Sequence, residues 1–208
     1  IPDYKKVIYV KIFRQYCNIL PKNGQINKNN YIKMEDKNLS KPSFTNVLNG
    51  LKTRLSHTNL LTIQSSDGHL FDMSFKFNAP IDEDIINSTE NLPEDYKNFL
   101  RLHNGADFFS WEYGTSFYIY SLEEALSVLE KVKTGIYVPM EYKDDWFPIG
   151  YVQDIGGVYI DLSSDKNYLI LMGIPVYELL CDFPTWLDRM IRVNGEMYWE
   201  WAGKELFL

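Results

Sequence analysis

The chain has 208 residues, of which 45% are hydrophobic and 24% charged, so it can build a buried core and is not wholly disordered. It contains no apolar run of about 18 residues, which excludes a membrane-spanning helix. A formal net charge of −7 at pH 7 disfavours direct binding of nucleic acid.

The charge is unevenly divided along the chain. Residues 1–69 carry 11 basic and 4 acidic side chains, a net charge of +7. Residues 70–208 carry the other 10 basic and 24 acidic side chains, a net charge of −14. An acidic surface explains solubility, and it also suits a strongly basic partner because complementary charge speeds encounter. Composition alone leaves both interpretations open.

Residues 1–43 are predicted to form a basic N-terminal extension. Residues 7–13 are rich in β-branched and aromatic side chains and predict a strand, whereas residues 21–43 are rich in Asn, Lys and Gly and predict a loop. The chain begins with Ile1 and not with Met, so we expect a trimmed start. Because no charged and apolar leader pattern is present, the cytoplasm is the expected compartment.

From residue 44 the spacing of apolar residues predicts helices and strands in alternating blocks. Asp67-Gly68 is typical of a hairpin turn, and Ser121 with Glu124 forms a capping-box pattern. The predicted elements are a helix over 44–55, strands over 60–64 and 69–77, helices from 82 and over 93–104, strands over 107–111 and 117–120, a helix over 121–133, strands over 146–152, 158–162 and 168–172, a helix capped by Asp182, and an aromatic strand or tail at 198–201. This order favours an α+β fold with a mostly antiparallel sheet flanked by helices.

The sequence contains little that points to catalysis or to a metal. Cys17 and Cys181 are the only cysteines, and neither has a second Cys or a His at the spacing of a zinc site. The Gly-rich phosphate loops and the G-x-S-x-G motif of hydrolases are missing. We therefore expect no enzyme activity, no metal and no cofactor.

Several features have both a functional and a plainer interpretation. Asp144-Asp145 could act as paired carboxylates, but adjacent residues point apart and favour a solvated turn. Residues 161–165 lack the ligand pattern of a calcium loop and favour a turn. His103 is expected near the carbonyls at the end of its own helix. The C-terminal aromatic residues could stack on a sugar, although their spacing favours a core. The tryptophans concerned are Trp146, Trp186, Trp199 and Trp201.

Three blocks of motifs stand in the order of a known superfamily. They are Phe75–Pro80 with Leu92–Gly105, Trp146–Gly150 with Gly157–Leu162, and Phe183–Ile191 with Asn194-Gly195 and Tyr198–Trp201. On these motifs, residues 45–203 resemble the SUKH superfamily, which includes the fungal Smi/Knr regulators of cell-wall synthesis. The resemblance implies a single α+β, SUKH-like domain over residues 44–208, without catalysis. It further implies that Pro93, Gly105 and Gly150 set backbone geometry. Four aromatic residues are expected to fill the core, namely Tyr96, Phe99, Trp146 and Trp186.

Bacterial members of this superfamily are regarded as immunity proteins that bind and neutralise toxins, often nucleases. With the acidic main domain, the resemblance predicts a non-enzymatic protein whose acidic face occludes the basic cleft of a toxin. The expected partner is a basic protein domain, with no direct contact to nucleic acid or membrane. The candidate residues for this face lie in or near predicted loops and are Asp107, Glu112, Glu141, Asp144, Asp145, Asp154 and Asp165.

Two other functions stay open at this point. The first is a regulatory interaction scaffold like the fungal relatives, without a toxin; an adjacent toxin gene would argue against it. The second is a carbohydrate-binding or carbohydrate-processing domain that uses exposed tryptophans and paired carboxylates. Burial of Trp199 and Trp201 would argue against the second.

Overall fold

The computed structural model describes residues 43–64, 68–89, 91–136 and 142–201, except the side chains of Glu200 and Trp201. The predicted strand at 7–13 and the loop at 21–42 therefore lie outside the described residues, and the N-terminal extension stays a prediction. The chain divides into two compact units, residues 1–40 with 64–71 and residues 41–63 with 72–208. In the first unit the described residues are Gln64, which ends a strand, and 68–71, which lead into the next.

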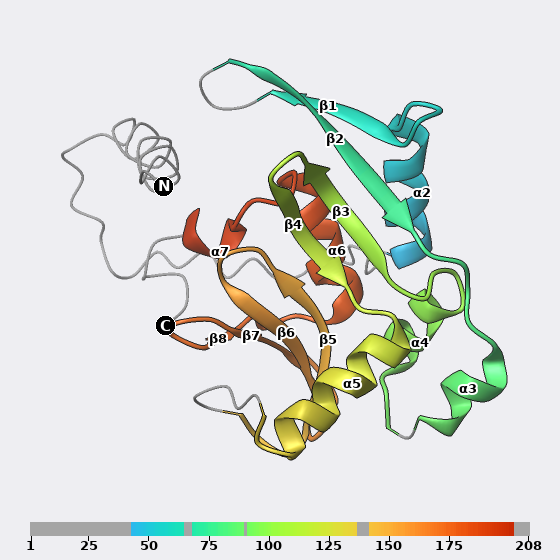
Figure 1. Ribbon diagram of the computed structural model, residues 1–208, viewed down its shortest axis with the longest axis vertical. Coiled ribbons are helices and arrows are strands. Elements are labelled where there is room, and N and C mark those ends of the chain that lie inside the picture. Colours follow the sequence, from blue (N-terminus) through green and yellow to red (C-terminus); the bar gives the residue numbers. More distant parts are fainter. Residues whose placement is uncertain (1–42, 65–67, 90, 137–141, 202–208) are drawn as a thin grey trace, which may run out of the picture. The chain divides into compact units, whose positions relative to one another are not determined.

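The structure confirms the predicted α+β fold (Figure 1). The strands are β1 (Leu60–Gln64), β2 (Leu70–Phe77), β3 (Ala106–Trp111), β4 (Gly114–Ile119), β5 (Trp146–Val152), β6 (Gly156–Asp161), β7 (Leu169–Met172) and β8 (Tyr177–Glu178). They form one sheet in chain order, and every neighbouring pair from β2 to β8 is antiparallel. Each strand thus lies beside its neighbours in the sequence.

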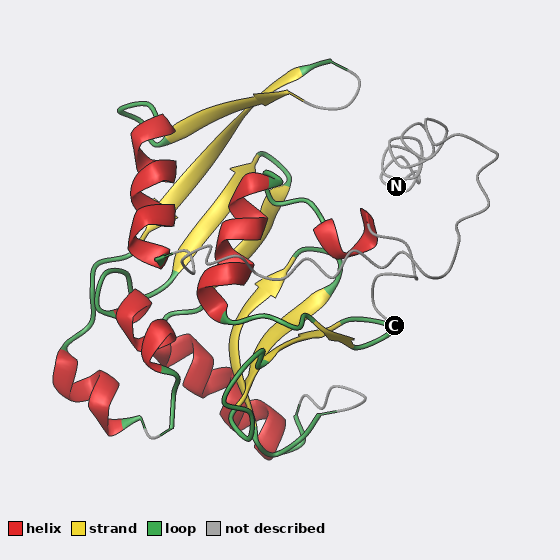
Figure 2. Ribbon diagram, turned by 180° about the vertical axis from the view of Figure 1, so that it is seen from behind, coloured by secondary structure: helices red, strands yellow, loops and turns green. Residues whose placement is uncertain are grey.

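Helices lie on both sides of this sheet. They are α2 (Phe44–Arg54), α3 (Glu83–Ser88), α4 (Glu94–Leu100), α5 (Leu122–Lys133), α6 (Phe183–Arg192) and α7 (Tyr198–Trp201). Helices α2, α4 and α6 contact one another on one face of the sheet, whereas α5 lies on the other side against β5 (Figures 1 and 2). We call the first side the helix-covered face and the second the open face.

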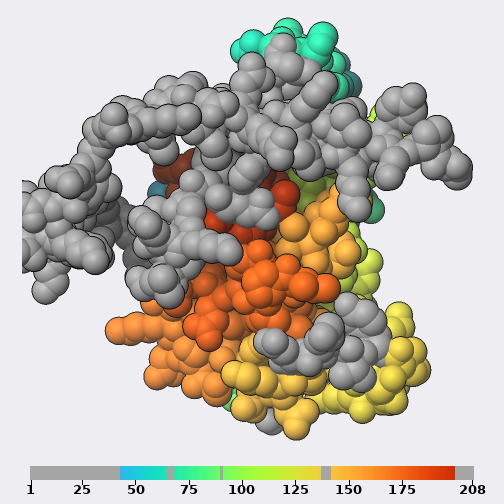
Figure 3. All heavy atoms as spheres, turned by 90° about the vertical axis from the view of Figure 1, so that its left-hand side faces the viewer, coloured from blue at the N-terminus to red at the C-terminus, as the bar shows by residue number. Residues whose placement is uncertain are grey.

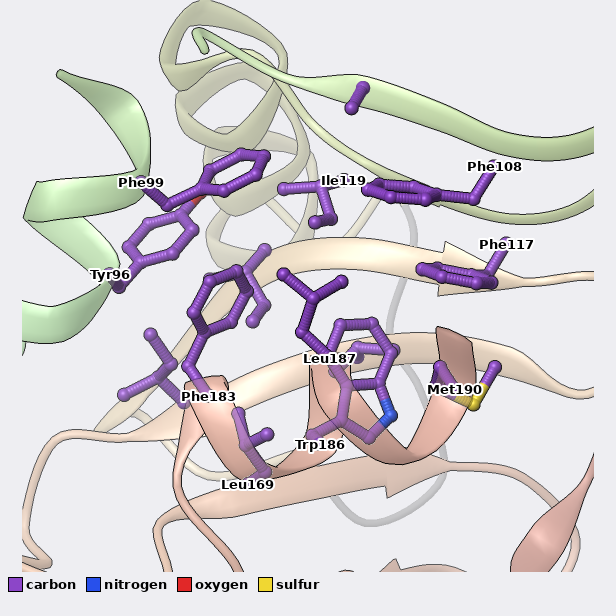
Figure 4. Packing of buried hydrophobic residues seen from close by; sticks show 14 of the residues in the cluster. Tyr96, Phe99, Phe108, Phe117, Ile119, Leu169, Phe183, Trp186, Leu187 and Met190 are labelled. Carbon is purple, nitrogen blue, oxygen red and sulfur yellow. The ribbon is translucent and has the colours of Figure 1, made fainter. Parts of the chain in front are cut away.

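The helix-covered face holds the main hydrophobic core (Figure 4). Phe108 of β3 stacks on Phe117 of β4 with ring centroids 4.6 Å apart. Trp186 of α6 meets Phe117 edge-on, with centroids 5.4 Å apart. Tyr96, Phe99 and Trp186 are fully buried. Trp146 is also buried, in a second cluster with Tyr159 and Ile170. The core positions implied by the family resemblance are therefore confirmed.

Local sequence signals explain where several helices begin. The hydroxyl of Ser121 accepts a hydrogen bond from the Glu124 N–H, and the Glu124 carboxylate accepts one from the Ser121 N–H, so the predicted capping box is formed. The Asp182 carboxylate accepts a hydrogen bond from the Thr185 N–H and begins α6 as predicted. Ser43 precedes α2 but makes no side-chain hydrogen bond as a cap.

Helix α4 is shorter than the predicted helix over 93–104. It ends at Leu100, and the chain then turns back into β3. Gly105 in this turn has φ +92°, and a side-chain carbon there would lie 2.7 Å from the Ser121 nitrogen. Only glycine fits both conditions, which confirms that Gly105 sets backbone geometry.

The C-terminal part differs from the prediction in two ways. Residues Tyr198–Trp201 form the short helix α7 and not a strand. The second difference is the short strand β8, which was not predicted and pairs with Ile170 and Leu171 of β7. Strand β8 lies at the edge of β7, and Trp199 of α7 is buried in the main core.

Candidate protein-interaction surface

The structure separates the predicted acidic residues into three places. Glu112 lies in the β3–β4 turn and Asp154 in the β5–β6 turn, at one end of the sheet. Asp144 and Asp145 precede β5 at the opposite end, where the Leu162 N–H donates to the Asp145 carbonyl at 2.8 Å. Asp165 lies in the adjoining β6–β7 loop. The described candidates therefore do not form one continuous acidic face.

The two remaining candidates have other positions. Asp107 lies within β3, half-buried, and is paired across the sheet with Lys76 and Tyr118. Glu141 lies outside the described residues. Asp107 thus lies in the strand predicted over 107–111, which begins one residue earlier than predicted, at Ala106.

Most candidate acids form no ion pair with a described basic side chain. Glu112, Asp144, Asp145, Asp154 and Asp165 are all exposed. Within the described ranges, the ion pairs join other acids, Glu83 and Glu94 with Arg101, and Asp188 with Arg192. The loop carboxylates are therefore available to attract a basic partner.

A row of polar side chains crosses the open face. Register pairs Lys76 with Asp107, Asp107 with Tyr118, and Tyr118 with Tyr151, so their side chains share one side of the sheet. The Tyr118 and Tyr151 rings stack with centroids 5.6 Å apart. A hollow of about 540 Å³ lies between this row and α5. Its lining includes Lys76, Asp107, Tyr118, Tyr120, Glu124 and Lys131.

The electrostatics of the hollow favour contact over proton transfer. Partial burial raises the pKa of the Tyr118 hydroxyl, and the charges of Glu124 and Asp107 act in the same direction. The phenol therefore stays protonated at neutral pH and can donate a hydrogen bond. Two lysines and two carboxylates in the lining offset each other. The hollow could not be predicted from the sequence, because its lining depends on cross-strand register. The spacing of Tyr118 and Tyr120 did indicate that these two side chains share one face of the sheet.

Three of the four tryptophans considered for a sugar platform are enclosed in the described part of the chain. Trp146, Trp186 and Trp199 are all buried. The side chain of Trp201 lies outside the described residues. The named lining of the hollow is tyrosine and not tryptophan. The burial of Trp199 argues against the carbohydrate hypothesis, whereas the part of that prediction that concerns Trp201 falls outside the described side chains.

His103 has a different environment from the predicted one. The Lys52 ammonium donates to His103 Nε2 at 2.6 Å, and His103 Nδ1 lies 2.9 Å from the Asn78 carbonyl oxygen. A neutral ring with its proton on Nδ1 satisfies both contacts. Because α4 ends at Leu100, the ring faces a carbonyl that follows β2 and not those of its own helix. His103 therefore joins α2 to the segment after β2.

The described part of the chain contains no cluster of three His, Cys, Asp or Glu side chains that could hold a metal. Cys181 is buried, and burial raises the pKa of its thiol to about 11, so the thiol stays protonated at neutral pH. The Asp161 carboxylate accepts hydrogen bonds from the Ser163 N–H and hydroxyl, as expected for a turn. Among the described helices, none is long and apolar enough to cross a lipid bilayer.

Comparison with known proteins agrees with this fold. The model of the SMI1 / KNR4 family (SUKH-1) matches residues 82–189, just over half of the chain. The chain is 30% identical over 174 residues to the uncharacterized protein YobM of Bacillus subtilis (strain 168), which covers 74% of this chain and 90% of YobM. It is also 30% identical over 142 residues to the uncharacterized protein YnaB of the same strain, covering 62% of this chain and 89% of YnaB. The chain belongs to the SMI1 / KNR4 family.

Proposed function

We propose that this chain is a non-catalytic binding protein that neutralises a cognate toxin by occluding the toxin's active site. Membership of the SMI1 / KNR4 family supports a role in protein interaction. The proposal rests mainly on the exposed loop carboxylates, which form no ion pair among the described residues. They lie in residues 70–208, which have a net charge of −14. This arrangement suits a basic toxin domain, such as that of a nuclease, because opposite charge steers encounter and selects the partner.

The proposed mechanism requires affinity and coverage but no chemistry. A nuclease cleft is basic because it binds phosphates. An acidic protein that fits into the cleft competes with the nucleic acid for the same positive charges. Neutralisation then depends on how slowly the complex dissociates, so the proposal predicts a tight and salt-sensitive complex.

Co-expression with the product of the adjacent gene tests this function. The full chain is expected to restore growth to cells that produce the adjacent protein and to co-purify with it at low salt. A matched control is Phe117→Ala, which should disrupt the core and abolish rescue. Co-purification without any toxicity to relieve would favour the regulatory scaffold. If the adjacent gene product is toxic and the folded chain neither binds it nor restores growth, neutralisation is refuted.

A further inference from the structure

Among the turns that join β3 to β8, three short ones lie at one end of the sheet. Antiparallel pairing places the turns at residues 112–113, 153–155 and 173–176 on the same side of the strands that they join. We call this surface the three-turn end. From β3 to β8 it spans five strand spacings, about 24 Å, which fits within one side of a standard protein interface.

Close contacts join neighbouring turns. The Gln153 N–H donates to the Ser116 carbonyl of β4 at 2.9 Å, which ties the β5–β6 turn to the β3–β4 hairpin. A side-chain carbon at Gly173 would lie 3.1 Å from Cγ2 of Ile155, so the β7–β8 turn contacts the β5–β6 turn. The three turns therefore form one continuous surface that needs little ordering when it binds.

Two large apolar side chains project from this surface into solvent. Tyr113 is 68% exposed and Ile174 is 93% exposed. The segment around the β7–β8 turn, coloured orange, lies at the surface in Figure 3. Neither side chain contributes to the hydrophobic clusters of the described chain. Large side chains of this kind, desolvated on binding, supply most of the affinity of protein interfaces.

The charge of the three-turn end is of one sign. Glu112 and Asp154 are both exposed, and residues 112–114, 153–156 and 173–176 include no Lys or Arg. The opposite end differs, because Lys143 precedes Asp144 and Lys166 follows Asp165. The negative charge of the three-turn end is therefore not interrupted by a base within the turns, which suits a basic partner.

We propose that the three-turn end is the surface that enters the basic cleft of the protein partner, with Tyr113 and Ile174 as apolar anchors and Glu112 and Asp154 as the charged rim. This inference rests on the proposed function for its partner, a protein with a basic cleft. The partner surface that fits is basic and contains an apolar cavity. Projecting turns suit entry into a cleft, whereas the hollow beside α5 is concave.

Two matched charge reversals separate the ends of the sheet. The double variants E112K/D154K and D144K/D145K change the net charge equally, at opposite ends and at exposed positions. With the adjacent gene's toxin domain as the probe, E112K/D154K is expected to slow association about tenfold or more at low salt, and D144K/D145K much less. An equal or larger effect of D144K/D145K would overturn the inference.

Truncation of the anchors tests the apolar part of the proposal. Tyr113→Ala and Ile174→Ala are each expected to speed dissociation from the same toxin domain about tenfold or more, with little change in association rate. The control is Leu126→Ala, which removes a 42% exposed side chain from α5. Unchanged dissociation in both anchor variants would overturn the assignment of anchors. Thermal melting of each variant checks that its fold is intact.

A second experiment needs no toxin and so separates the two proposals. A synthetic peptide of alternating Lys and Leu is titrated into the ¹⁵N-labelled full chain, and amide shifts are followed by NMR. Shift changes gathered at residues 112–114, 153–155 and 173–174 support the inference. Changes centred on residues 143–145 and 163–166, or none, contradict it. Peptide binding at the three-turn end without rescue of cells would refute only the proposed function, and rescue unaffected by E112K/D154K would refute only the inference.

Discussion

The two faces of the sheet differ in what fills them, although the same strands supply both. On the helix-covered face one cross-strand row contains Phe77, Ala106 and Ile119. The next row on the open face contains Asp107 and Tyr118. Residues adjacent in the chain therefore have different roles, because successive side chains in a strand point to opposite faces. Substitutions on the helix-covered face should therefore mainly lower stability, and substitutions on the open face should affect it much less.

The largest expected effect comes from two neighbouring residues of β4. Phe117→Ala removes a fully buried ring from the helix-covered face and should lower the free energy of unfolding by about 3–5 kcal/mol. Tyr118→Ala removes a half-buried ring from the open face and should cost about 1 kcal/mol. Urea unfolding followed by circular dichroism measures both. Equal losses would contradict the difference between the faces.

Close packing of β4 on β5 gives the next largest effect. A side chain at Gly150 would overlap the Tyr118 carbonyl, so Gly150→Ala should lower the free energy of unfolding by about 1–3 kcal/mol. The control is Gly50→Ala on α2, where a new methyl group meets nothing within 4 Å. That change should raise stability by about 0.5–1 kcal/mol, because alanine favours helix. A stabilising Gly150→Ala in thermal or urea unfolding would disprove the close approach.

A buried hydroxyl links helices on the covered face. Tyr168, just before β7, donates a hydrogen bond to the Asp95 carboxylate of α4 and accepts one at 3.1 Å from the Phe183 N–H of α6. Tyr168→Phe should lower the free energy of unfolding by about 1–2 kcal/mol. Tyr142→Phe, which loses a bond to the Trp146 carbonyl, is the control and should cost about 0.5–1 kcal/mol. The ranking is checked by urea unfolding, and a reversed order would contradict this role.

The smallest expected effect depends on pH. Burial lowers the pKa of His103 below its usual value of about 6.5, and the Lys52 charge acts in the same direction. The unfolded chain therefore protonates His103 more readily than the folded chain does. The stability that comes from keeping His103 neutral is complete above about pH 6.5, and it is lost as pH falls through the lower pKa of the folded chain. Melting temperatures at pH 7.5 and 5.0 should differ less for His103→Gln than for the unaltered chain. The exposed His57→Gln should leave the difference unchanged, and an equal change in both variants would count against His103.

Sequence reasoning succeeded where the signal is local. The capping box at Ser121, the strand Trp146–Val152 and the cap at Asp182 all depend on residues a few positions apart, and the structure confirms them. It failed where the outcome depends on distant segments. The segment 198–201, predicted as a strand or tail, is the helix α7, and its Trp199 packs in a core built from residues far away in the chain. His103 contacts Lys52, which is 51 residues away in the chain.

The same division applies to the candidate surface. Sequence identified Glu112 and Asp154 as exposed acids, but only the antiparallel pairing places their turns at one end, away from Asp144 and Asp145. Tyr113 and Ile174 carried no separate signal, because an apolar residue in a turn becomes notable only when nothing covers it. The acidic excess was evident from composition, whereas its distribution was not.

The chain-order arrangement of the sheet has a consequence for how such a protein can change over time. Because each strand pairs with its neighbours in sequence, residues can be inserted into or removed from one turn without altering the register of the other hairpins. The turns at one end can therefore diverge rapidly while the aromatic core stays the same. A fold of this kind can follow a changing partner at little risk to its own folding.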